Sequence, residues 1–186
     1  SFGWKSLLKH SQLDGLSLAV ATCLIEALKK FSSEELKIKW PNDLLINKKK
    51  ISGILIETSD SKEGLDVVIG IGINVHMDES EGADIDQSWG NLDELPSNKT
   101  DRNKIIVSII SEIHELFKEY PKSGFENYHE VFESHNLLKD KLCAVNTDKE
   151  ELEGKVLGVN KSGELLFERN GEIQHLRYGE VSIREL

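Results

Sequence analysis

Residues 37–57 read KIKWPNDLLINKKKISGILIE, and this stretch predicts three short strands joined by two tight turns. Apolar residues alternate with lysines over residues 36–40, which is the two-residue period of a strand with one buried face. Pro41 ends this strand because it has no N–H for a strand ladder, and the Asn-Asp pair that follows is typical of turns. Two further apolar runs flank a lysine-rich turn. The stretch therefore gathers a carboxylate, an amide and several lysines at the ends of adjacent strands.

These groups have two interpretations. Runs of charge are usually solvated, so a plain surface hairpin with exposed lysines is one of them. The other is a binding site, because a site that holds a phosphate and a carboxylate and positions an amine needs this set of groups.

Composition limits the classes of function. The chain has 186 residues, 38% of them hydrophobic and 30% charged, which is ordinary for a globular protein. Its formal net charge of −10 argues against nucleic-acid binding by this chain. We see no apolar run of transmembrane length and no signal peptide. Cys23 and Cys143 have no metal-type partners in the sequence, so we predict reduced thiols in a cytoplasmic protein.

Three helices and one more buried strand are expected before residue 138. Apolar residues at spacings of three and four predict a helix over residues 11–31, capped by Ser11 or Asp14. A second helix is expected over residues 100–120, with Pro121 stopping it, and a shorter third helix over residues 125–136.

Residues 65–75 read LDVVIGIGINV and predict a strand buried on both faces. Gly70 and Gly72 lack side chains at alternate positions, which leaves room for a ligand or another backbone. Core packing is the alternative explanation of the two glycines. Asn74 is a polar residue at the end of this strand.

The hydrophobic period changes from 3.6 to 2 near residue 138, where we place a domain boundary. Five short strands are expected in residues 139–186, and Asn170-Gly171 is a strong two-residue hairpin signal. Short strands at this spacing predict a small SH3-like β-barrel that docks on residues 1–138.

Several strings closely resemble the biotin protein ligases. They are Lys-Trp-Pro-Asn-Asp at residues 39–43, Lys-Ile-Ser-Gly-Ile-Leu at residues 50–55 with Glu57, the Gly-x-Gly block that ends in Asn74, and residues 179–184. The resemblance extends over essentially the whole chain. It implies an α+β fold, with a mixed sheet flanked by helices as in class II synthetase-like ligase domains, followed by a small SH3-like barrel.

The same resemblance implies an ATP-dependent biotin–[acetyl-CoA-carboxylase] ligase. Such an enzyme makes biotinyl-5′-AMP from biotin and ATP and transfers biotin to a lysine of a biotin carboxyl carrier protein. Lys50 would bridge the biotin carboxylate and the α-phosphate, and Asp43 would orient the incoming lysine and help remove its proton. The implied substrate- and adenylate-binding residues are Lys39, Trp40, Asn42, Gly53, Gly72, Asn74, Trp89 and Arg184.

Two of these residues have specific implied roles. Asn74 would contact adenine, since its amide can donate and accept hydrogen bonds together. Trp89 would cover the adenine from a lid over residues 77–96, a loop with seven acidic residues and no basic ones. A solvated acidic loop with an incidentally buried tryptophan is the alternative.

Ligand and partner expectations follow from the family. Mg²⁺ would accompany ATP, held mostly by phosphates and water, and no protein metal site is expected. The Gly-Arg-Gly-Arg-x-Gly-Arg loop of these ligases is not found in the sequence, so we expect residues 1–186 alone not to biotinylate a carrier. Sheet-edge pairing makes a homodimer possible, no membrane partner is expected, and DNA would be bound only through a helix-turn-helix domain outside this chain.

Three other functions stay open. A lipoate or octanoate transferase shares the fold and the acyl-to-lysine chemistry, but the Lys-Trp-Pro-Asn-Asp string and the predicted barrel argue against it. A biotinyl-AMP-sensing effector domain of a transcriptional repressor would bind the adenylate without transferring it, and a plain interaction module would do neither.

Overall fold

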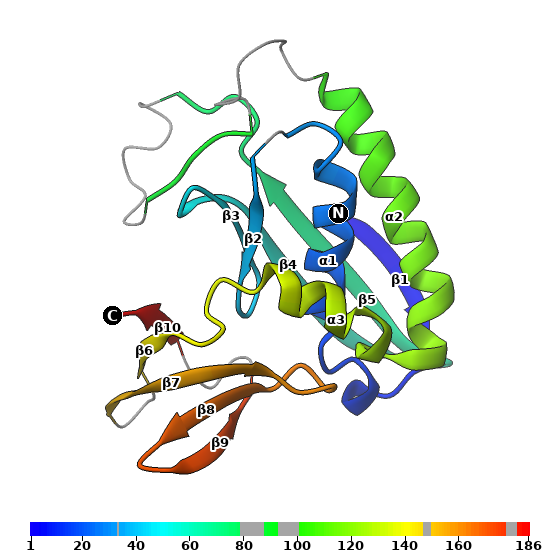
Figure 1. The fold of residues 1–186 in the computed structure, drawn as a ribbon. Helices are drawn as coiled ribbons and strands as arrows, with labels where there is room; N and C mark the ends of the chain where they lie inside the picture. Colours follow the sequence, from blue (N-terminus) through cyan, green and yellow to red (C-terminus); the bar gives the residue numbers. More distant parts are fainter. Residues whose placement is uncertain (33, 79–87, 93–100, 147–149, 178–181) are drawn as a thin grey trace.

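The computed structural model describes residues 1–32, 34–78, 88–92, 101–146, 150–177 and 182–186, which form two five-stranded sheets and three α-helices (Figure 1). Elements of the larger unit are β1 (Phe2–Ser6), the short 3₁₀ helix η1 (His10–Gln12), α1 (Leu16–Leu28), β2 (Leu36–Lys39), β3 (Asp43–Ile46), β4 (Lys49–Ser61), β5 (Gly64–Ile73), α2 (Arg102–Ser123) and α3 (Glu126–His135). The smaller unit contains β6 (Leu142–Asn146), β7 (Glu151–Val159), β8 (Leu165–Arg169), β9 (Glu172–Leu176) and β10 (Ser182–Glu185). The element types therefore match the α+β prediction.

The first sheet has the order β1-β5-β4-β3-β2, and all its described strand pairings are antiparallel. The expectation of a mixed sheet is wrong for these strands. Strands β2 to β5 follow one another through tight turns, and a tight turn can join only antiparallel neighbours.

All three α-helices lie on one face of this sheet, which we call the helical face (Figure 1). Helix α1 is the central element, because every residue in it except Ser17 and Glu26 is buried. Residues 10–28 are apolar enough by length and composition to cross a membrane, but their burial against α2, α3 and the sheet is that of a core helix. The opposite face of the sheet, which we call the open face, leaves Leu55 55% and Val68 43% exposed.

Helix ends differ from the prediction in two places. Gly15, at φ 79°, is the N-cap of α1 in place of Ser11 or Asp14, and a Cβ at this position would lie 2.6 Å from Phe125 Cβ. Helix α2 begins as expected, with Asp101 accepting a hydrogen bond from the Asn103 amide at 2.9 Å. Pro121 does not stop it, because the helix continues to Ser123 and ends at Gly124.

The second sheet has the order β10-β6-β7-β8-β9, again antiparallel. The predicted hairpin is confirmed, with Asn170 at φ 55° and Gly171 at φ 81° between β8 and β9. In the described residues β9 and β10 are the two ends of this sheet and do not pair, so its closure into a barrel is not observed.

The smaller unit docks on α3 and on the start of α1. The Glu133 carboxylate accepts a hydrogen bond from the Val159 amide at 2.8 Å, and His129 Nε2 lies 2.8 Å from the Val159 carbonyl oxygen. Lys161 forms an ion pair with Glu126 on the same side. These contacts fix the 158–163 turn against the helical layer.

Glu164 is the centre of a charged cluster beside this turn. Its carboxylate accepts hydrogen bonds from Arg177 Nε at 2.8 Å and Asn160 Nδ2 at 2.7 Å, and lies 3.1 Å from His175 Nδ1. The guanidinium of Arg177, then His175 and Asn160, lower the pKa of Glu164 from its usual 4.5 to about 2. The ionised carboxylate is therefore the form that the folded state stabilises.

This cluster predicts a pH dependence of stability. Because the folded pKa of Glu164 lies below its unfolded value, its contribution is complete above about pH 4.5 and is lost as the pH falls towards about 2. Glu164→Gln should be less stable than the parent near neutral pH, and its free energy of unfolding should fall less steeply on acidification. Urea unfolding at several pH values measures this, with Glu172→Gln, exposed on β9, as the control. Equal slopes for the two variants would contradict the assignment.

Candidate functional site

Strand register places four of the predicted site residues in one row across the open face. Lys39 on β2 pairs with Asp43 on β3, Asp43 pairs with Gly53 on β4, and Gly53 pairs with Gly72 on β5. Directly paired residues of antiparallel strands point to the same side of a sheet. Residues on the other side of these strands, such as Ile38, Leu44 and Ile54, are buried under the helices.

A β-bulge brings Lys50 to the same face. Leu44 pairs with Ser52 and Leu45 with Lys50, so Ile51 is the extra residue of β4. In a regular strand Lys50 and Gly53 would point to opposite sides, because their separation is odd. One extra residue reverses this alternation, which is how bulges commonly redirect side chains.

Lys50 and Asp43 form an ion pair, with Nζ 2.7 Å from Oδ1. Their side chains are 28% and 16% exposed, so the pair is partly withdrawn from water. Asp43 Oδ1 has no regular hydrogen bond in the described part of the chain, so the ammonium of Lys50 compensates its charge. The site thus holds a cation and an anion in contact on one face.

Glycines leave a hollow beside this pair. A Cβ at Gly53 would lie 3.3 Å from Lys50 Cε and 3.6 Å from Asp43 Oδ1, so a side chain there would crowd both groups. The hollow has a volume of about 440 Å³ and is lined by Ser1, Asn42, Lys50, Gly53, Ile54, Leu55, Gly70, Ile71 and Gly72. It combines one ammonium with an exposed leucine and bare backbone, which suits an anion that carries an apolar chain.

Asn74 and Trp89 lie at the Lys50 end of the hollow. The Lys50 amide donates to the Ser88 carbonyl at 3.0 Å, and the Gly90 amide donates to the Lys50 carbonyl at 2.9 Å, so Trp89 bridges to Lys50. The Asn74 amide donates to the Ile51 carbonyl at 2.8 Å. Residues 79–87 and 93–96 of the expected lid lie outside the described residues.

Three predicted residues make contacts away from the row. Trp40 is 1% exposed on the helical face, and its indole N–H donates to the Gly163 carbonyl. Asn42 Nδ2 donates to the Ile54 carbonyl at 2.9 Å, so its amide supports the turn. Arg184 on β10 pairs with Glu151 at 3.0 Å.

Leu55, which sequence reasoning did not single out, lines the hollow, and so does Gly70, which it did. They pair with each other across β4 and β5, and each is two residues from a predicted glycine. The two-residue period from Gly53 is the signal that could have identified Leu55. The 179–181 part of the C-terminal string lies outside the described residues.

The fold that carries this site is that of the biotin protein ligases. A crystal structure of biotin protein ligase from Aquifex aeolicus matches with a TM-score of 0.81 and 27% identity, over 95% of this chain and 77% of that chain. The same enzyme in complex with biotin and ATP matches with a TM-score of 0.79 and 27% identity, over 94% and 72% of the two chains.

Sequence comparison agrees. Residues 3–74 match the model of the Biotin/lipoate A/B protein ligase family. Bifunctional ligase/repressor BirA from Escherichia coli is 33% identical over 172 residues, which are 91% of this chain and 53% of that protein. The chain thus spans about half the length of this curated relative.

Proposed function

We propose that this chain is the part of a biotin protein ligase that holds the Lys50–Asp43 pair. In the proposed reaction the biotin carboxylate attacks the α-phosphorus of ATP, which releases pyrophosphate and gives biotinyl-5′-AMP. The amine of a lysine on a biotin carboxyl carrier protein then attacks the biotinyl carbonyl, which releases AMP and a proton and forms an amide. The observation that carries the proposal is the ion pair on the open face, next to a hollow with an apolar wall.

Lys50 serves the first half-reaction. A carboxylate and a phosphate repel each other as they approach, and a compact cation between them offsets that repulsion. The Lys50 side chain is 28% exposed and lines the hollow, so its ammonium can contact both anions. Leu55 and the Gly53 and Gly72 backbones would receive the apolar part of biotin.

Asp43 serves the second half-reaction. When Lys50 turns to the two anions, the carboxylate of Asp43 loses its ammonium partner. The ammonium of the carrier lysine can take that place, which positions its nitrogen at the mixed anhydride and assists loss of its proton. One carboxylate would therefore pair with two different lysines in succession.

The remaining assignments rest on resemblance and placement. Asn74 and Trp89, both tied to the Lys50 backbone, would bind adenine, and Lys39 and Arg184 would contribute positive charge. Mg²⁺ would accompany ATP, held mostly by its phosphates and water. Division at residue 138, an SH3-like form of residues 139–186, a cytoplasmic location and a homodimer are parts of the same proposal.

Lipoate or octanoate transfer is the second candidate, because the matching family model includes lipoate ligases as well as biotin ligases. Adenylate formation with biotin but not with lipoate or octanoate would decide between them. A repressor role, as in the name of the Escherichia coli relative, would require a DNA-binding segment in addition to this chain.

Lys50→Ala is the direct test of the first half-reaction, made in the full-length natural polypeptide that carries this chain. Loss of a close charge contact in the transition state costs about 2–4 kcal/mol, so adenylate formation should fall by roughly 30- to 1000-fold. Pyrophosphate release measures it. Lys48→Ala, on the same turn but 76% exposed, is the matched control and should change the rate little. Similar losses in both variants would reject the special role of Lys50.

Asp43→Asn tests the second half-reaction, because it keeps the shape of the turn residue and removes its charge. Transfer of biotin from preformed biotinyl-5′-AMP should slow by about 10²-fold or more, whereas adenylate formation should slow far less. Single-turnover assays separate the two steps. If both steps slow alike, Asp43 has a structural or general binding role instead.

A further inference from the structure

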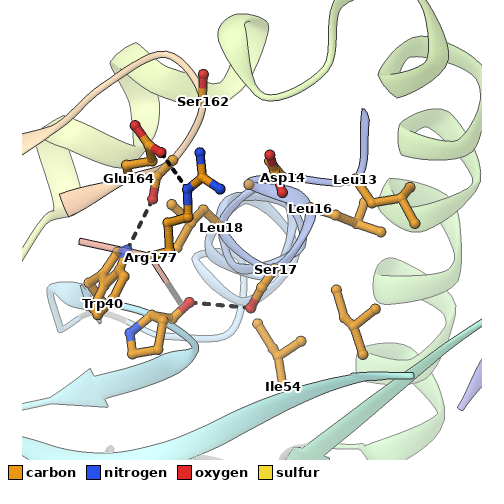
Figure 2. A pocket seen from close by; sticks show the side chains of 14 residues that line it. Leu13, Asp14, Leu16, Ser17, Leu18, Trp40, Ile54, Ser162, Glu164 and Arg177 are labelled. Atoms are coloured by element: carbon orange, nitrogen blue, oxygen red, sulfur yellow. Dashed lines mark hydrogen bonds and ion pairs between the residues drawn. The ribbon is translucent and has the colours of Figure 1, made fainter. Parts of the chain in front are cut away.

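Trp40 does not belong to the row that faces the hollow. Lys39 points to the open face with Asp43, so the next residue points to the helical face, where Trp40 is 1% exposed. There its ring lines a cavity of about 280 Å³ between the start of α1 and the smaller unit (Figure 2). A ligand on the open face cannot touch this side chain.

The indole instead joins the larger unit to the smaller one. Trp40 Nε1 donates to the Gly163 carbonyl at 3.1 Å, as Figure 2 shows. The turn that carries this carbonyl is well fixed, because Asn160 Oδ1 accepts from the amides of Ser162 and Glu164 at 2.9 and 3.0 Å. A Cβ at Gly163 would lie 2.8 Å from Gly15 Cα, so the turn also sits directly on the start of α1.

Four consecutive residues, 40–43, are held by contacts from the turn before β8, from α1 and from β4. After Trp40, the Pro41 carbonyl accepts from Ser17 Oγ of α1 at 3.2 Å (Figure 2). Asn42 exchanges hydrogen bonds with Ile54 of β4, at 2.9 Å through its side chain and 3.0 Å through its carbonyl. Asp43 is then held by Lys50. Of these four anchors, that of Trp40 is the one supplied by the smaller unit.

We propose that Trp40 is a positioning residue through which the smaller unit holds Asp43 in place for acyl transfer. The inference rests on the proposed function of Asp43. Loss of the indole N–H would leave the Gly163 carbonyl without this donor and free the start of the 40–43 segment. Three residues further on, the carboxylate would lose its fixed placement against Lys50. The affinity of the open face for biotin would change little, because Gly53, Leu55 and Gly72 belong to strands that Trp40 does not anchor.

Two variants of the full-length natural polypeptide test this. Trp40→Phe removes the N–H and keeps an aromatic ring. Replacement of Trp40 by the non-natural residue β-(3-benzothienyl)alanine also removes the N–H but keeps the ring size, which guards against loss of folding. Trp4→Phe is the matched control, because Trp4 is a partly buried indole that stacks on Phe117 at 5.0 Å, away from the 40–43 segment.

Both Trp40 variants should lower kcat for transfer from preformed biotinyl-5′-AMP by about 10-fold or more, since small misplacements of reacting groups are costly. KM for biotin in adenylate formation should change by less than about twofold. Trp4→Phe should alter none of these.

An unchanged kcat for transfer in the benzothienyl variant would overturn the inference, and so would equal losses in Trp40→Phe and Trp4→Phe. The parent polypeptide is assayed first for biotinyl-5′-AMP. If it makes none, the proposed function fails and the inference falls with it. If it makes the adenylate and the Trp40 variants transfer normally, only the inference fails.

Discussion

The partly buried ion pair between Lys50 and Asp43 is the constraint on which the rest of the site depends. Two charges withdrawn from water are costly unless they compensate each other closely, and these two are 2.7 Å apart. The contact requires both side chains on one face of the sheet, which the extra residue Ile51 in β4 makes possible. It also requires a small neighbour, and Gly53 supplies one. A single-residue shift of register would separate the pair.

The chemistry of the open face depends on positions where its strands carry no side chain. Along β4 and β5, residues on the helical face such as Ile54 and Ile69 are large and buried, whereas Gly53, Gly70 and Gly72 leave the backbone uncovered by side chains on the other side. The net charge of the chain is −10, yet Lys39 and Lys50 lie on this face near the hollow. Local positive charge within an acidic protein favours binding of small anions at one place over general attraction to polyanions.

The hydrophobic period predicted most helices and strands, because it is 3.6 residues in a helix and two residues in a strand. The second and third helices agree with the predicted ranges to within a few residues, all five strands expected in the smaller unit are present, and Asn170-Gly171 forms the expected hairpin. Proline is a weaker signal near a helix end, since Pro121 removes only one hydrogen bond from a helix that is about to finish. Antiparallel pairing of the first sheet was missed because the resemblance, and not the turn lengths, supplied the expectation of a mixed sheet.

The sequence predicted which residues form the site, but it did not predict the directions in which their side chains point. The family strings singled out Asp43, Lys50, Gly53 and Gly72, which the structure brings together. A string does not say which way a side chain points. A bulge reverses the alternation of side chains, and it can be located only when the partner strand is known. Trp40 illustrates the limit, because it lies within the most specific string yet faces the helical layer and the smaller unit.

The position of Trp40 also gives a physical reason for the order of residues in Lys-Trp-Pro-Asn-Asp. Alternate side chains of a strand point in opposite directions, so the lysine and the tryptophan of the string lie on opposite faces of one sheet. Pro41 and Asn42 then turn the chain so that Asp43 returns to the face of Lys39. The last four residues of the string each have their own partner, and the partners of Trp40 and Asp43 lie on opposite sides of the sheet. This five-residue segment therefore connects the smaller unit to the open face of the first sheet, and the connection needs no long-range movement.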